Sequence, residues 1–98
     1  MRSGDILIVD FGVPIGSTPA VVITTQPTLD EFEQTFHVVP ITTNRRDWPT
    51  DVVTDRGHAQ CHLVTTVDQI QIVQRTAENV GPTTLTQIRE VVAVLLGL

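Results

Sequence analysis

The segment FHVVPITT, Phe36 to Thr43, and the polar run NRRDWPT that follows it, Asn44 to Thr50, lie near the middle of the chain. β-Branched and apolar residues dominate the first segment, which predicts a β-strand. Its internal Pro40 has no amide hydrogen, so we expect this strand to lie at a sheet edge or to contain a bulge. The polar run places Arg45 and Arg46, two of the six basic residues, at the end of the strand. Such a tip is either a binding site for an anion or a solvated hairpin that protects an edge strand.

Short apolar segments on both sides of this region predict further strands. DILIVDF and AVVITT have strand composition, and the second is expected to be a central strand. QPTLDEFEQ predicts one helical turn capped by Thr28. QRTAENVGP is expected to be a connector, with or without a helical turn. The predicted strands outside the opening segment are Asp5–Phe11, Ala20–Thr25, Thr50–Thr54 and one or two more within Gln60–Val73.

The period of the apolar residues changes near the C-terminus, where they recur three and four positions apart. This spacing predicts a helix over residues 84–96, and Thr84 followed by Gln87 fits a capping box at its start. No helix-length segment separates the strands, so parallel βαβ units are not expected. We therefore predict a single α+β domain, residues 1–98, in which a small, mostly antiparallel barrel of five to seven strands precedes a C-terminal helix.

Composition narrows the classes of function. The chain has 98 residues, 41% of them hydrophobic, and a net charge of −5, which argues against broad nucleic-acid binding through an overall positive field. A local arginine cluster still acts alone, because salt screens charges beyond about 8 Å. No apolar run reaches the roughly 20 residues that a bilayer requires. We expect a cytoplasmic protein with no membrane partner.

Five short motifs occur in an order that resembles the MazF/PemK/Kid-type toxins of type II toxin–antitoxin systems. They are GDILIVDF, PAVVI from Pro19, VVPITTN from Val38, DQI from Asp68 and the final LLGL. The resemblance implies an SH3-like barrel with a C-terminal helix that forms a homodimer and binds a cognate antitoxin. It also implies an endoribonuclease that cleaves single-stranded RNA at specific sequences without a metal or other cofactor. The 2′-hydroxyl attacks the adjacent phosphate and leaves a 2′,3′-cyclic phosphate.

The same resemblance assigns candidate site residues. By the family pattern, Thr42 lies at the scissile phosphate. Fixed donors aimed at the developing charge of a phosphate are effective catalysts. Asp68 and Gln69 either hold a base edge or form an ordinary strand pair. The remaining candidates for RNA binding are Ser17, Thr18, Thr43 and Asn44.

The sequence departs from the family pattern at one important position. Family members carry an arginine before the PAVV motif, whereas this chain has GSTPAVV, with Thr18 at that position. Three alternatives follow: Arg45 or Arg46 supplies the missing charge, cleavage persists at a lower rate on Thr42, or the chain binds RNA or antitoxin without cutting. We favour the first. A gyrase poison of the same fold, similar to CcdB, is a further alternative that would use the terminal helix instead.

Histidine and cysteine chemistry is left open. The general base that takes the 2′-hydroxyl proton is not assigned among His37, His58 and His62. In HAQCH, two histidines and one thiol are too few for a typical zinc site, and Cys61 is expected to be a small buried or half-buried residue. Trp48 either packs on the barrel or stacks on a base.

Overall fold

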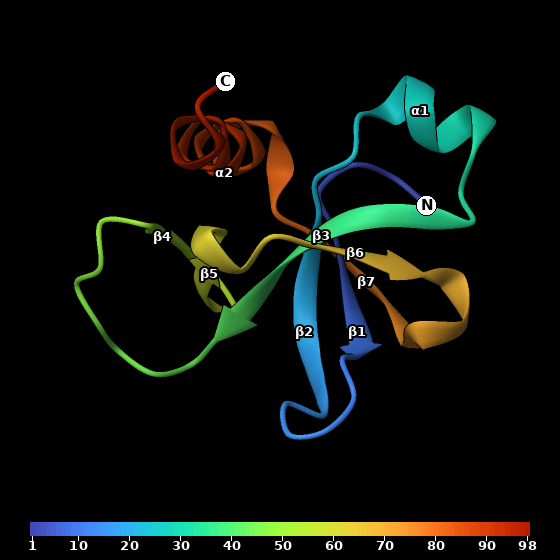
Figure 1. Cartoon of the computed structure of the whole chain (residues 1–98), viewed down its shortest axis with the longest axis horizontal. Helices are drawn as coiled ribbons and strands as arrows, with labels where there is room; N and C mark the ends of the chain where they lie inside the picture. The colour runs from blue at the N-terminus through green and yellow to red at the C-terminus, as the bar shows by residue number, and fades with distance from the viewer.

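The computed structural model describes all 98 residues, and Figure 1 shows a curved sheet flanked by two helices. The long strand β3 passes through the middle of the molecule, and the helices α1 and α2 lie above it in this view. Strands and helices occur in the order β1 (Asp5–Asp10), β2 (Ser17–Val22), α1 (Gln26–Glu31), β3 (Thr35–Thr42), β4 (Asp51–Thr54), β5 (Gly57–Gln60), β6 (Thr65–Asp68), β7 (Ile72–Asn79) and α2 (Gly81–Leu96). Two 3₁₀ turns, η1 (Cys61–Leu63) and η2 (Gln69–Gln71), flank β6.

All strand pairs are antiparallel, and the seven strands form one sheet. The pairing order is β4-β5-β3-β2-β1-β7, and β6 also pairs with β3. This arrangement confirms the predicted α+β class with a C-terminal helix. The sheet is not closed, because no ladder joins β7 to β4. The predicted barrel is therefore an open, curved sheet.

Pro40 lies inside the sheet, so the prediction of an edge strand or a bulge is wrong. Pro40 pairs with Ala20 of β2, and the β2–β3 register has no shift. The carbonyl of His37 accepts from the amide of Ile23 on the β2 side, so the alternation of the backbone turns the Pro40 nitrogen to the opposite side. On that side β6 pairs with residues up to 38 and β5 with residues from 41. The missing amide hydrogen falls where β3 changes partner, and no ladder bond is lost.

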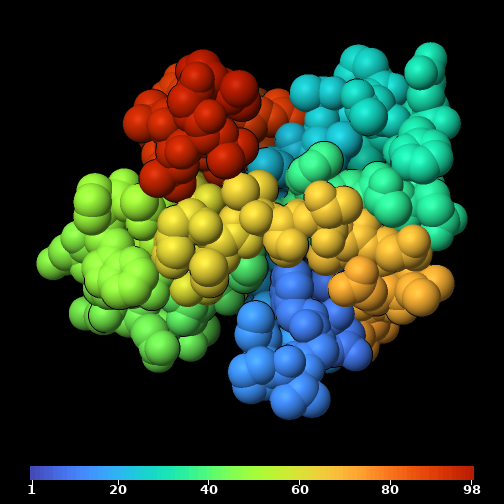
Figure 2. Space-filling view, in the orientation of Figure 1, coloured from blue at the N-terminus to red at the C-terminus, as the bar shows by residue number.

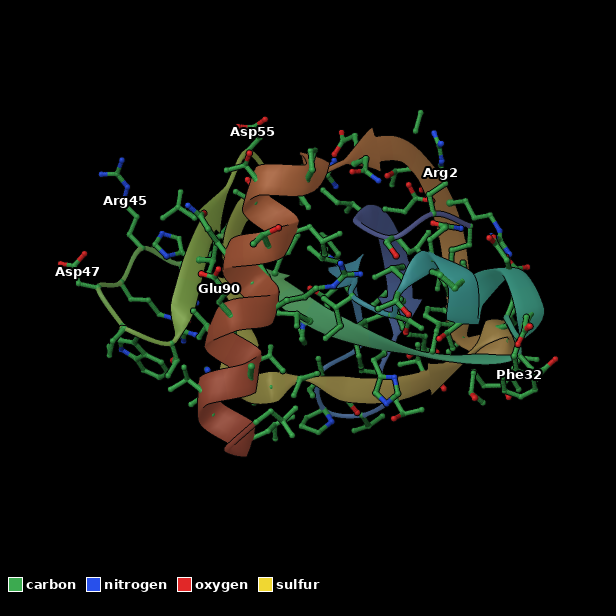
Figure 3. The ribbon with its side chains drawn as sticks, turned by 90° about the horizontal axis from the view of Figure 1, so that it is seen from above. Arg2, Phe32, Arg45, Asp47, Asp55 and Glu90 are labelled. Carbon is green, nitrogen blue, oxygen red and sulfur yellow. The ribbon has the colours of Figure 1, made fainter.

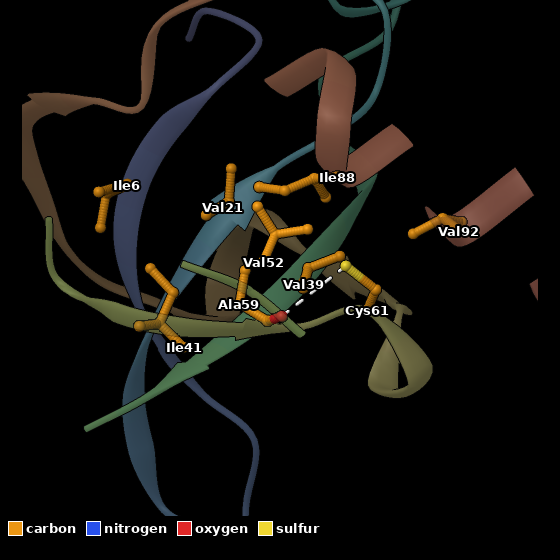
Figure 4. Close-up of a cluster of buried hydrophobic side chains, with 9 residues drawn as sticks. All are labelled: Ile6, Val21, Val39, Ile41, Val52, Ala59, Cys61, Ile88 and Val92. Carbon is orange, nitrogen blue, oxygen red and sulfur yellow. Dashed lines mark hydrogen bonds between the residues drawn. The ribbon is translucent and has the colours of Figure 1, made fainter. Parts of the chain in front are cut away.

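The two faces of the sheet carry separate cores. Side chains alternate along a strand, so Val39 and Ile41 lie in one cluster and Phe36 and Val38 in the other. Fully burying each such side chain stabilises the fold by roughly 1.5–3 kcal/mol. Helix α2 covers the first cluster, shown in Figure 4, whose members are Ile6, Val21, Val39, Ile41, Val52, Ala59, Cys61, Ile88 and Val92.

Two local predictions fail at element ends. Residues 74–79, expected to be a connector, belong to β7, which pairs only with β1. As an edge strand with one partner, β7 has mostly exposed residues and lacks the apolar run that marks a buried strand. The predicted caps are also absent: α1 begins after Thr25 and α2 after Val80, and neither residue makes a side-chain cap hydrogen bond. A proline in the first turn starts each helix instead.

Helix α2 buries only part of its apolar surface. Leu85, Ile88 and Val92 are buried, whereas Val94, Leu96 and Leu98 beyond them are exposed. No helix of the protein is long and apolar enough to cross a membrane.

Candidate active site

A groove of about 440 Å³ lies at the C-terminal end of β3. In Figure 2 the surface is indented here, between the blue β1–β2 loop and the green segment that follows β3. The groove combines an apolar floor with hydroxyl and amide groups. Its lining residues are Ile15, Thr18, Pro19, Pro40, Ile41, Thr42, Thr43, Asn44, Gln60 and Leu63.

Two threonines line this groove, Thr18 from β2 and Thr42 from β3. The paired part of β2 and β3 ends at Ala20 and Pro40, and both threonines lie beyond it. The Thr18 hydroxyl donates to the carbonyl of Ile41 at 3.3 Å. Thr42 Oγ1 accepts from the amide of Asn44 at 3.2 Å and donates to no protein acceptor. The Thr42 hydroxyl hydrogen is therefore available to a ligand.

The two adjacent arginines have different environments. Arg45 is exposed and forms no salt bridge or side-chain hydrogen bond, and Figure 3 shows it projecting outward beside Asp47. The guanidinium of Arg46 binds both carboxylate oxygens of Asp51, at 2.5 Å from Nε and 2.9 Å from Nη2. Arg46 also lies over the Trp48 ring, with its central carbon 3.7 Å from the ring centroid. Arg45 is free to meet a phosphate, and Arg46 is already paired.

The paired carboxylate of Asp51 connects Arg46 to a histidine. The Asp51 side chain is only 1% exposed, and the hydrogen bond from Arg46 to it raises the pKa of Arg46 above its ordinary value. His58 Nδ1 lies 3.6 Å from Asp51 Oδ2. A second groove, of about 350 Å³, is lined by Arg45, Arg46, Asp47 and His58.

Asp68 and Gln69 lie away from the groove. Asp68 pairs with Thr35, seven residues before Thr42 on β3 and so about 23 Å from it at ~3.3 Å per residue. The Asp68 carboxylate accepts from the amide of Ile70 and from Gln34, and these hydrogen bonds lower the pKa of Asp68. This carboxylate caps η2. The structure does not bring Asp68 and Gln69 together with Thr42 within one chain.

The other candidates have clear positions. Ser17 is exposed and pairs with Asp10 at the end of the β1–β2 hairpin. Thr43 and Asn44 are exposed at the groove. Cys61 is buried, its thiol contacts the carbonyl of Ala59 at 3.7 Å, and burial raises its pKa to about 11. A buried, protonated thiol is unsuited to act as a nucleophile.

Sequence reasoning left His58 unassigned. His58 lies directly opposite Thr42 in the β3–β5 ladder. The residues next to His58 in the sequence do not indicate this pairing, because Thr42 lies sixteen positions earlier in the chain. The pairing is set by the β4–β5 hairpin, in which Val53 also pairs with His58. A prediction of that hairpin register and of its return to β3 would have found it.

Solved structures that resemble this chain include toxins and endoribonucleases. A mycobacterial endoribonuclease in complex with its cognate antitoxin is 22% identical with a TM-score of 0.85, over 100% of this chain and 96% of its own. MazF from Deinococcus radiodurans is 17% identical with a TM-score of 0.84, over 100% and 97%. The toxin MazF-mt6 of Mycobacterium tuberculosis is 17% identical with a TM-score of 0.75, over 96% and 97%. No curated protein sequence matches the chain.

The open antiparallel sheet with its C-terminal helix places this protein in the class of MazF-like folds. The model of the PemK-like, MazF-like toxins of type II toxin–antitoxin systems matches residues 2–96. The chain belongs to that family.

Proposed function

We propose that this chain is a sequence-specific, metal-independent endoribonuclease toxin that cleaves single-stranded RNA in the cytoplasm. The observation that carries the proposal is the Thr42 hydroxyl, which has no protein acceptor and lines a groove at a strand end. Arg45, three residues further on, adds a cation without a partner. Family membership supports a toxin, and the structural neighbours described as endoribonucleases support cleavage of RNA.

The RNA supplies its own nucleophile in this reaction, so the protein has to supply hydrogen-bond donors to the phosphate. The 2′-hydroxyl of the RNA loses its proton and attacks the adjacent phosphorus, and the bond to the 5′-oxygen breaks. The products are a 2′,3′-cyclic phosphate and a 5′-hydroxyl. Negative charge grows on the non-bridging oxygens, where one well-placed donor is typically worth about 10²–10³ in rate. In the proposal, Thr42 and Arg45 supply this stabilisation.

Of the two arginines, Arg45 is the better candidate to replace the arginine that Thr18 displaces. A guanidinium donates two parallel hydrogen bonds to a phosphate. Arg46 already donates both of these hydrogen bonds to Asp51. If Arg46 bound the phosphate instead, the buried Asp51 carboxylate would lose its partner. Arg46 is then a residue that shapes the loop, and Arg45 is the one that meets the RNA.

RNA binding in the groove would involve the polar groups around Thr42. Thr18, Thr43 and Asn44 line the same groove, and Ser17 lies beside it. Asp68 and Gln69 would contact RNA only some 20 Å away, at ~3.3 Å per residue of β3. A strand of several nucleotides that runs along β3 would reach both places.

The partners proposed for this chain are a second copy of itself and a cognate antitoxin. The end of α2 exposes the apolar side chains of Val94, Leu95, Leu96 and Leu98, and exposed apolar patches mark interaction sites. A neighbouring mycobacterial structure contains its own antitoxin. We therefore propose both a second copy of this chain and an antitoxin as its partners.

The decisive experiment is digestion of a long RNA by the purified protein in EDTA, followed by mapping of the new ends. We expect cuts at one short motif with 5′-hydroxyl and cyclic phosphate ends, and a loss of about 10²-fold or more in Thr42→Ala. Thr66→Ala is the matched control, because Thr66 is an exposed strand threonine without side-chain hydrogen bonds. Equal cleavage by Thr42→Ala and the control contradicts the assigned role of Thr42.

A second comparison separates the arginines. Arg45→Gln is expected to slow cleavage without changing the stability of the fold, and Arg75→Gln, an exposed arginine on the edge strand, serves as control. Arg46→Gln, in contrast to Arg45→Gln, is expected to lower the thermal stability of the fold. If the wild-type protein leaves RNA intact yet binds it, the chain is the inactive relative. If its expression linearises DNA instead, it acts as a gyrase poison.

A further inference from the structure

We infer that His58 is the general base of the cleavage reaction and that Asp51 positions it. This inference rests on the proposed endoribonuclease function and deepens it by assigning the proton transfer. It is carried by a juxtaposition that the chain creates only on folding, because residues 42, 51 and 58 lie on three adjacent strands.

The first step of the argument is the position of His58 relative to Thr42. The two residues are direct partners in the β3–β5 ladder. Directly opposed residues point to the same face of a sheet, with Cβ atoms about 4.5–5.5 Å apart. The ladder therefore places one hydroxyl and one imidazole side by side on neighbouring strands.

The second step is the environment of the imidazole. Nδ1 of His58 is buried, lies 3.6 Å from Oδ2 of Asp51 and has no hydrogen-bond partner. Nε2 has no protein partner either and is not buried. With Nδ1–H directed to the carboxylate, Nε2 is the basic nitrogen and faces solvent. A distance slightly too long for a hydrogen bond is common in an unliganded site, where such contacts tighten when the substrate binds.

The third step is that Asp51 is held in place for this role. Its carboxylate is 1% exposed and takes two hydrogen bonds from Arg46. A proton on Nδ1 directed to this carboxylate leaves Nε2 free. Asp51 acts through His58 and is a positioning residue. The two hydrogen bonds from Arg46 hold the carboxylate in position.

The fourth step concerns the charges that face His58. Asp51 approaches it from β4, and Arg45, Arg46 and Asp47 line the same groove from the β3–β4 loop. Two carboxylates and two guanidiniums thus surround the imidazole. Arg45 and His58 line this groove, Thr42 lines the other one, and the pairing of Thr42 with His58 joins the two. Neither of the other histidines has this setting.

His37 and His62 fit the role less well. His37 is exposed and pairs with Thr66, on the side of β3 that faces away from Thr42. His62 is exposed on η1, where its ring lies 5.4 Å from the Trp48 ring and contacts the Thr50 hydroxyl at 3.3 Å. Only His58 combines a carboxylate partner with a ladder position beside Thr42.

The step itself balances. His58 Nε2 takes the proton of the 2′-hydroxyl as the 2′-oxygen forms its bond to phosphorus. The bond from phosphorus to the 5′-oxygen breaks, and the leaving oxygen takes a proton from water. The imidazolium then returns its proton to solvent. No oxidant, reductant or metal takes part.

The test compares the wild-type protein with His58→Gln and His58→Ala on the RNA that the wild type cleaves. General base catalysis contributes about 10²–10⁴ in rate, so we expect at least a 10²-fold loss in both variants. Added imidazole is expected to restore part of the rate in His58→Ala and none in Thr42→Ala. His37→Gln is the control, because His37 is an exposed histidine on β3, and this variant is expected to cleave like the wild type.

The pH profile of the wild type gives a readout that does not depend on the folding of a variant. Imidazole is the ordinary side chain that changes protonation between pH 5 and 8, so the rate of the wild type should rise with unit slope on the acid side of that range. Asp51→Asn should move this limb, whereas His37→Gln should not.

Three results overturn the assignment. A His58→Gln variant that cleaves within threefold of the wild type removes His58 from the reaction while leaving the endoribonuclease proposal intact. A wild-type profile without an acid limb between pH 5 and 8 does the same. A wild-type protein that cleaves no RNA, although it is folded, ends both the proposed function and this inference.

Discussion

Replacing Gly57 by alanine tests how closely β5 must approach β3 for the site to form. Gly57 has a φ of +132°, which L-residues rarely adopt, and a Cβ there would lie 2.4 Å from the Thr42 carbonyl oxygen. The backbone strain alone costs about 1–3 kcal/mol. The contact is about 1 Å too short, so the strands must separate and lose a ladder hydrogen bond worth about 1 kcal/mol. We expect Gly57→Ala to destabilise the fold by about 2–4 kcal/mol.

The matched control is Gly16→Ala. Gly16 also has a positive φ, +74°, but a Cβ there meets nothing within 4 Å, so only the conformational cost of about 1–2 kcal/mol applies. Thermal unfolding followed by circular dichroism resolves the two variants, because 1 kcal/mol shifts the midpoint by roughly 4–8 °C in a domain of this size. Gly57→Ala is also expected to cleave RNA more slowly, since it displaces Thr42 from His58. Equal unfolding midpoints for the two variants would show that the close approach of β5 to β3 does not contribute to stability.

Three further predictions concern stability and reactivity. Ile88 is fully buried under α2, so Ile88→Ala should cost about 2–5 kcal/mol in urea unfolding, against about 0.5 kcal/mol or less for the exposed Val94→Ala; similar midpoints would contradict the packing of this helix. Because burial raises the pKa of Cys61 to about 11, the native protein should react with a disulfide reagent at pH 8 only as fast as it unfolds, and the guanidine-denatured protein should react at once; rapid labelling of folded protein would contradict a buried thiol. Asp68 has a lowered pKa in the fold, so its contribution to stability is present above the unfolded value of about 3.9 and is lost as the pH falls through the folded value. The free energy of unfolding of the wild type should therefore decline more steeply below about pH 4 than that of Asp68→Asn, and parallel curves would rule out this linkage.

Much of the fold can be predicted from the amino-acid sequence. The β-branched runs predict most of the strands near their observed bounds, and the three- and four-residue spacing predicts α2. β7 escapes prediction because an edge strand with one partner needs no apolar run. Pro40 misleads because its effect depends on which neighbouring strand meets its nitrogen, and that is a property of pairing. The helix caps fail because a proline in the first turn starts both helices.

The candidate site divides in the same way. Thr42 and the paired arginines can be named from a motif, because family patterns record residue types at short spacing. The different roles of the two arginines cannot be named from the motif. Arg46 differs from Arg45 only because it contacts the Asp51 carboxylate and the Trp48 ring after folding.

The amino-acid sequence alone determined the class of the domain, its many strands and its C-terminal helix, because secondary-structure propensity and hydrophobic periodicity act over a few residues. The juxtaposition of Thr42 and His58 arose from pairing between β3 and β5, which are not consecutive in the chain. The physical reason is that hydrogen-bonded registers, not sequence distance, set which side chains share a face. A buried carboxylate with an arginine on one side and a histidine on the other exists only once those registers are in place.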